Sequence, residues 1–146
     1  MKKVYDTINQ YCVEHELLTN GDGIVIGLSG GMDSVCLLQV LAALRNEWQL
    51  RLVCVHVHHG IRGTVADEDA AFAQRLAAKY NISFRLYEMD IPQLAKEQGL
   101  SEEEAGRNYR YRCFEEVRKE LNFDKIAVAH HRDDQAETVL WQILRG

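Results

Sequence analysis

Two adjacent glycines flanked by serines make one short segment a candidate phosphate-binding loop. The segment reads Ser29, Gly30, Gly31, Met32, Asp33 and Ser34. Glycine accepts positive φ angles and lets the backbone approach a ligand closely, so successive N–H groups can point into one concavity. The pattern matches neither the G-x-x-x-x-G-K-S/T loop of ATPases nor the dinucleotide-binding G-x-G-x-x-G. We expect residues 29–34 to bind phosphate groups.

An acidic pair near the end of the sequence is the next candidate for chemistry. If a helix begins near Asp133, then Asp134 and Glu137 lie three residues apart on one of its faces. His130 then ends the preceding strand and faces the same cleft. Magnesium prefers one or two carboxylates plus phosphate oxygens and water, so Asp33 and Asp134 are its candidate ligands. Helix capping is the alternative role for Asp133 and Asp134.

Five histidines in two segments raise the question of a zinc site. They are His56, His58, His59, His130 and His131. No two of them have i, i+4 spacing and no cysteine accompanies them, so zinc is disfavoured. His56 alternates with apolar residues, which is also the pattern of a core histidine with satisfied hydrogen bonds.

The elements that position these residues follow from hydrophobic periodicity. The expected strands cover 24–28, 52–57, 83–89 and 125–129, and the expected helices cover 4–18, 34–46, 67–80, 92–99, 101–120 and 133–144. Strands joined by helical crossovers predict an α/β fold with a doubly wound, mostly parallel sheet and a cleft beyond the carboxyl ends of the strands. Gly-Gly at a strand end is usually a plain turn, but two flanking serines, Asp33 and the following helix favour phosphate binding.

Length and composition limit the class of protein. The chain has 146 residues, of which 47% are hydrophobic and 27% charged, so it suits one globular domain and excludes collagen-like or disordered classes. The net charge of −5 means that any nucleic-acid contact is a local patch. No segment resembles a membrane helix, and the first residues are too acidic and polar for a signal peptide. We therefore expect a cytoplasmic protein without membrane contact.

The four cysteines are widely spaced, and none belongs to a C-x-x-C pair. They are Cys12, Cys36, Cys54 and Cys113. Cys36 and Cys54 lie within apolar runs, where a thiol packs as a small buried residue. We expect reduced, structural cysteines, which disfavours zinc ribbons and redox motifs.

The loop S-G-G-M-D-S after a hydrophobic strand resembles the pyrophosphate-binding loop, or PP-loop, of the N-type ATP pyrophosphatases. GMP synthetases, NAD synthetases, tRNA thiolases and tRNA(Ile)-lysidine synthetases all carry such a loop. Further segments, in the same order, resemble the N-terminal catalytic domain of the tRNA(Ile)-lysidine synthetases. These segments are 56–62 with 66–69, 103–111 and 130–138. Gly106 departs from this pattern, in which a second alanine is more usual, and affects helix propensity rather than chemistry.

The resemblance implies a Rossmann-like fold of the adenine nucleotide alpha hydrolase type. It implies that residues 1–146 are a truncated N-terminal ATP-pyrophosphatase domain without its tRNA-binding C-terminal domains. ATP and Mg²⁺ are the implied cofactors, and Arg110, between two tyrosines, is the implied contact to the nucleotide phosphate or the activated base. The implied catalytic residues are Asp33, Arg110, His130, Asp134 and Glu137.

The implied reaction joins free L-lysine to C2 of the wobble cytidine of a tRNA(Ile) with a CAU anticodon. The reaction proceeds through an adenylated base and releases AMP and pyrophosphate. A homodimer is a possible state of the protein. Two alternatives stay open. A tRNA 2-thiolation enzyme usually needs a catalytic or cluster-binding cysteine pair, which this sequence lacks. A non-catalytic adenine-nucleotide module is mildly favoured by the acidic net charge, and it would bind ATP without releasing pyrophosphate.

Overall fold

The computed structural model describes residues 6, 9, 10, 13, 14, 17–29, 32–60, 65–129 and 143–145, with the backbone alone at 32, 33 and 143–145. The described strands are β1 (Gly23–Gly27), β2 (Arg51–His58), β3 (Ser83–Glu88), β4 (Lys125–Val128) and β5 (Ile143–Arg145). They form one sheet in the order β3-β2-β1-β4-β5, in which β1 to β4 are parallel. The predicted α/β fold with a mostly parallel sheet is confirmed.

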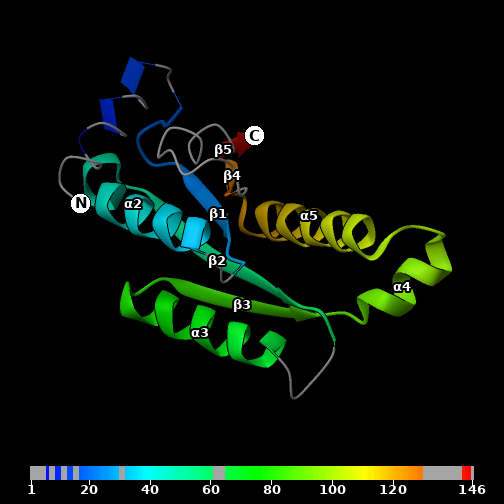
Figure 1. Ribbon diagram of the computed structural model, residues 1–146. Helices are drawn as coiled ribbons and strands as arrows, with labels where there is room; N and C mark the ends of the chain where they lie inside the picture. Colours follow the sequence, from blue (N-terminus) through cyan, green and yellow to red (C-terminus); the bar gives the residue numbers. More distant parts are fainter. Residues whose placement is uncertain are drawn as a thin grey trace.

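Helices cover both faces of this sheet. The described ones are α2 (Met32–Trp48), α3 (Val65–Lys79), α4 (Ile91–Gln98) and α5 (Glu102–Leu121). Helices α2 and α3 pack on one face and α5 packs on the other (Figure 1). The chain leaves β3 and returns to β4 on the far side of β1, so the strand order reverses between β1 and β4. None of these described helices is both long and apolar enough to cross a membrane.

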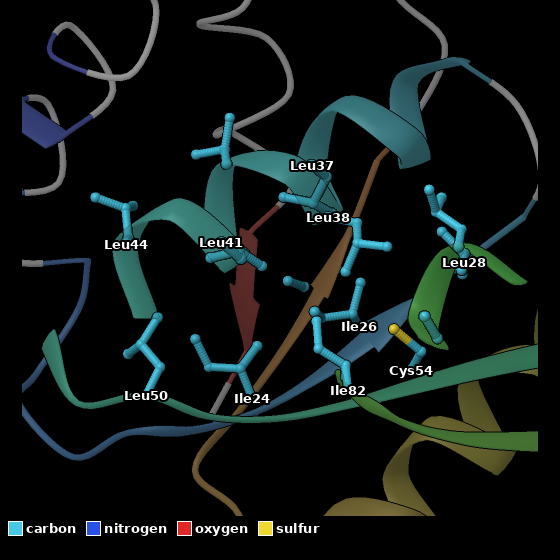
Figure 2. Packing of buried hydrophobic residues seen from close by; sticks show 14 of the residues in the cluster. Ile24, Ile26, Leu28, Leu37, Leu38, Leu41, Leu44, Leu50, Cys54 and Ile82 are labelled. Atoms are coloured by element: carbon cyan, nitrogen blue, oxygen red, sulfur yellow. The ribbon is translucent and has the colours of Figure 1, made fainter. Parts of the chain in front are cut away.

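Strand β1 lies at the centre of the core because its side chains are buried on both faces. Ile24 and Ile26 pack with the leucines of α2 (Figure 2), whereas Val25 packs with Phe114 of α5. A strand buried on both faces needs a continuous apolar run rather than alternation. The central position of β1 fixes the loop that follows it at the middle of the carboxyl edge.

Capping residues define the ends of α4 and α5. The Ser101 hydroxyl accepts a hydrogen bond from the Glu104 N–H at 3.1 Å, so Ser101 caps the start of α5. Asp90 caps α4 through the Gln93 N–H. Gly99 ends α4 with φ 67°, as expected of a left-handed helix terminus.

The predicted helix over 133–144 is wrong at its end. Residues Ile143–Arg145 form β5, which pairs antiparallel with β4. A short apolar run suits a strand as well as a helix, and the hydrogen bonds offered by the edge of β4 favour the strand. Residues 130–142 lie outside the described part of the chain. The predicted helix over 4–18 also lies largely outside it, although residues 6, 9, 10, 13 and 14 are helical.

A buried ion pair ties the amino edge of the sheet together. The Asp22 carboxylate lies 2.8 Å from Lys125 Nζ, with side chains only 7% and 19% exposed. The same carboxylate accepts a hydrogen bond from the Thr19 N–H at 2.8 Å, and Lys125 Nζ donates to the Leu17 carbonyl at 2.7 Å. The pair therefore joins the turn before β1 to the start of β4.

Candidate functional site

The predicted phosphate loop lies between the carboxyl end of β1 and the amino end of α2. Ser29 follows the strand, and Ser34 lies in the first turn of α2. Their hydroxyl oxygens are 3.2 Å apart and hydrogen-bonded, and Ser34 is buried. The two ends of the loop are thus joined. The positive end of the α2 dipole faces the same region, which favours an anion there.

A cavity of about 230 Å³ opens beside the loop, over the carboxyl ends of β1, β2 and β4. Strand ends form part of its lining, together with residues of α3 and α5. Its polar lining residues are Ser29, His56, His59, Asp69, Arg110 and Tyr111. Open α/β sheets bind ligands at this edge, where the strand order reverses.

Arg110 lies where this cavity meets a second one of about 420 Å³, which α4 and the first turns of α5 border. His59, Ala66 and Arg110 line both cavities. Burial is the main cause that lowers the pKa of Arg110 from its usual value, and the charge of Arg107 also lowers it. Within the described part of the chain, no carboxylate forms an ion pair with Arg110. Its charge is therefore available to a ligand.

A family profile described as a PP-loop domain matches residues 2–146. The chain belongs to the PP-loop domain family. This assignment agrees with the phosphate-binding loop predicted after β1 at residues 29–34.

Relatives of this PP-loop domain carry the name tRNA(Ile)-lysidine synthase. The protein of that name from Caldanaerobacter subterraneus subsp. tengcongensis is 49% identical over 146 residues, which are 100% of this chain and 30% of the relative. The one from Clostridium tetani is 41% identical over 143 residues, which are 98% of this chain and 30% of the relative. The chain thus spans about 30% of the length of these relatives.

Solved structures share the fold of this PP-loop domain at low sequence identity. The U34-tRNA thiolase NcsA from Methanococcus maripaludis superposes with a TM-score of 0.72 at 19% identity, over 89% of this chain and 44% of that one. The NH3-dependent NAD synthetase from Campylobacter jejuni gives 0.63 at 18% identity, over 86% and 55%. These likenesses confirm the predicted Rossmann-like fold.

The PP-loop domain brings some predicted site residues together. Ser29 and Arg110 line the first cavity, and Ser34 is hydrogen-bonded to Ser29. The predicted residues outside the described part are Gly30, Gly31, His130, Asp134 and Glu137, and the side chains of Met32 and Asp33 also lie outside it. The roles of these residues stay predictions.

Two cavity residues were given no role in nucleotide binding from the sequence. Asp69 and His59 line the first cavity, and burial followed by the charge of Arg110 lowers the pKa of His59. In the sequence, Asp67, Glu68 and Asp69 indicate the start of a helix, where the dipole favours negative charge, and residues 66–69 belong to a segment that carries the family resemblance. The i, i+3 spacing of Ala66 and Asp69, which places both on one side of α3, could have indicated the contact.

His58 ties the end of β2 to the start of α3. Its Nδ1 accepts a hydrogen bond from the Gly60 N–H at 2.8 Å, so Nε2 carries a proton and donates it to Asp67 Oδ1 at 2.5 Å. The His58 side chain is buried, and Asp67 lies in the first turn of α3. This bridge holds the backbone that carries His59 against the cavity.

Gly60→Ala is expected to lower the free energy of unfolding by about 2 kcal/mol. Gly60 has φ +91°, and an added Cβ would lie 2.7 Å from Asp90 Cα and 2.8 Å from the Met89 oxygen. Both neighbours are backbone atoms, which cannot move aside without shifting the chain before α4. Equilibrium denaturation in urea measures the loss.

Gly21→Ala is the matched control for this substitution. Gly21 has φ +85°, but an added Cβ would meet no atom of the described residues within 4 Å. Its expected loss is about 1 kcal/mol, from the positive φ alone. Equal losses for the two variants would show that the contact of Gly60 with the backbone near Asp90 contributes nothing.

Proposed function

We propose that this PP-loop domain binds ATP and, within its full-length protein, ligates lysine to the wobble cytidine of a tRNA(Ile) with a CAU anticodon. The observation that carries the proposal is the loop at the carboxyl end of β1, whose ends are joined by a hydrogen bond, with the Arg110 guanidinium across the neighbouring cavity and without an ion-pair partner among the described residues. The names of the relatives supply the substrate class. Action in the cytoplasm follows from a tRNA substrate.

The first step is adenylation of the base. The cytosine C2 oxygen attacks the α-phosphorus of ATP, a new P–O bond forms, and the bond to the β-phosphate breaks to release pyrophosphate. Loop N–H groups and the positive end of α2 stabilise the leaving pyrophosphate, and Arg110 offsets the charge that develops on the transferred phosphate. A carbonyl oxygen is a poor leaving group, and adenylation converts it into a good one.

The second step transfers lysine to the activated base. The neutral ε-amine attacks C2, a C–N bond forms, and AMP leaves with the former C2 oxygen. The amine must first lose a proton, because its unperturbed pKa is about 10.4. The candidates for the base or the lysine anchor are His130, Asp134 and Glu137. The product, lysidine, changes the codon that the tRNA reads from AUG to AUA.

Mg²⁺ suits the donor set that this chain offers beside a triphosphate. The described residues contain no group of three or more His, Cys, Asp or Glu that could hold a metal ion. Magnesium bound to nucleotide needs only one or two carboxylates, since phosphate oxygens and water complete its shell. Asp33, whose backbone lies in the first turn of α2, and Asp134 would hold it. When bound, Mg²⁺ neutralises charge on the leaving pyrophosphate.

Two of the three described cysteines, Cys54 and Cys113, do not favour the thiolation alternative. Burial raises the pKa of Cys54 to about 12, and burial also raises the pKa of Cys113. A thiolate is the reactive form of cysteine, so neither thiol is suited to sulfur transfer. Cys12 lies outside the described residues.

The proposal is tested by incubating the full-length protein with ATP, Mg²⁺, labelled lysine and a panel of tRNAs. Label is expected in an isoleucine tRNA with a CAU anticodon and in no other tRNA. Asp33→Ala is expected to reduce this incorporation at least about tenfold, because a magnesium ligand beside the phosphates is lost. Scintillation counting of purified tRNA measures the label.

Glu47→Ala, an exposed acid at the other end of α2, is the matched control and should incorporate lysine normally. Label in no tRNA, or full incorporation by the Asp33 variant, counts against the proposal. ATP binding without pyrophosphate release in the presence of any tRNA would instead support the non-catalytic module.

A further inference from the structure

His56 is a buried histidine that uses only one of its ring nitrogens in hydrogen bonds with the described residues. It lies on β2 beside the end of β1 and is 5% exposed. Its Nδ1 lies 2.6 Å from the Leu28 carbonyl oxygen. A carbonyl oxygen can only accept, so Nδ1 carries the proton and donates it. In the neutral ring, Nε2 therefore holds a lone pair.

Elimination places the Nε2 lone pair at the first cavity. His56 lines that cavity, and its only hydrogen bond among the described residues is the one to Leu28. No enclosed side-chain nitrogen or oxygen of the described residues lacks a hydrogen-bond partner. Because Nε2 has no partner among these residues, it must be accessible from outside the packed core. The open space beside His56 is the first cavity, so Nε2 is accessible from there.

The ring is held in its neutral form. Burial is the main cause that lowers the pKa of His56. The hydrogen bond to the Leu28 carbonyl and the charge of Asp69 oppose this shift, and the charges of His59 and His58 add smaller contributions that lower the pKa. At neutral pH the cavity therefore presents a fixed acceptor at Nε2. The Asp69 carboxylate, also an acceptor, lines the same cavity. An acceptor-rich wall favours a ligand group that donates hydrogen bonds.

We propose that His56 Nε2 accepts a hydrogen bond from an N–H or O–H group of the adenosine part of the bound nucleotide. This inference rests on the proposed binding of ATP at residues 29–34. Ser29 and His56 line the same cavity, so the nucleoside of a nucleotide whose phosphates lie at the loop is within reach of this ring. Ionised phosphates carry no donor, whereas adenosine offers its 6-amino group and two ribose hydroxyls. The amino group and the ribose hydroxyls are all hydrogen-bond donors, and nucleotide analogues distinguish between them.

Two substitutions divide the functions of the two ring nitrogens. His56→Asn places an amide nitrogen where Nδ1 was, which retains the donor to Leu28 and removes the acceptor at Nε2. His56→Gln places its amide oxygen at the position of Nε2 and restores the acceptor. Calorimetric titration of the full-length protein with ATP, without tRNA or lysine, is expected to show about three- to tenfold weaker binding for His56→Asn. His56→Gln should bind nearly as tightly as the unchanged protein.

Nucleotide analogues identify the donor. Purine riboside triphosphate lacks the 6-amino group, and the 2′-deoxy and 3′-deoxy forms of ATP each lack one hydroxyl. The unchanged protein should bind one of these analogues about three- to tenfold less tightly than ATP, and His56→Asn should bind that analogue and ATP equally. If the variant discriminates among all the nucleotides as the unchanged protein does, the proposal is wrong.

A measurement on the unchanged protein covers the case in which the variants fail to fold. The ¹⁵N resonances of the His56 ring should show a protonated Nδ1 and an unprotonated Nε2, and ATP should shift the Nε2 signal as expected of an accepted hydrogen bond. An unshifted signal, or a doubly protonated ring in the complex, overturns the inference. Failure of the unchanged protein to bind ATP at all overturns the proposed function instead.

Discussion

Arg110→Ala is expected to slow formation of the adenylated base about a hundred- to a thousandfold while the domain stays folded. The guanidinium is half-buried between two cavities and has no ion-pair partner within the described residues. A charge in such a partly dry site acts more strongly on developing phosphate charge than it would in water. Pyrophosphate release in a single turnover, with ATP and tRNA but no lysine, measures the step.

Arg112→Ala is the matched control for Arg110. Arg112 lies two residues further along α5, with its guanidinium 5.5 Å from the centre of the Tyr109 ring, and it lines neither cavity described above. The rate of pyrophosphate release should change little in this variant. Arg110→Lys keeps the charge but not the planar fork, so an intermediate rate is expected. Equal rates for the Arg110→Ala and Arg112→Ala variants would remove Arg110 from the proposed mechanism.

Asp22→Ala is expected to lower the free energy of unfolding by about 3 kcal/mol. The substitution leaves Lys125 Nζ without its carboxylate in a largely buried position. It also leaves the Thr19 N–H without its acceptor. Urea denaturation followed by circular dichroism measures the loss.

The exposed ion pair of Arg85 with Glu120 provides the comparison. Its nitrogen and oxygen lie 2.6 Å apart, but the Glu120 side chain is 60% exposed. Solvent screens such a pair, so Glu120→Ala should leave the midpoint of unfolding nearly unchanged. If Asp22→Ala and Glu120→Ala unfold at the same urea concentration, burial of the Asp22 pair adds no stability.

The centre of the fold was predictable because burial on both faces leaves a clear pattern in the sequence. The run at 24–28 predicted a strand, and β1 occupies Gly23–Gly27. The phosphate loop followed from the same run, since its place depends only on where that strand ends. Ser101 fixed the start of α5 through a local cap, which needs no distant partner.

Features that depend on distant contacts were not predictable from local patterns. Strand β5 forms because the edge of β4 offers it hydrogen bonds, and no residue within the run at 143–145 encodes that edge. The bridge from His58 to Asp67 likewise needs the turn at Gly60 to fix the tautomer of the ring. The open acceptor of His56 depends on the carbonyl of Leu28, which directly follows the neighbouring strand β1.

His59, Ala66 and Arg110 form a wall that is shared by the two cavities. A change of side-chain size at one of these shared positions therefore alters the volume of both cavities. Neither cavity can be redesigned alone by substituting these residues. Redesign of one cavity for a larger ligand therefore requires a substitution at a residue that lines that cavity alone. Phe114 belongs only to the smaller compartment and Pro92 only to the larger.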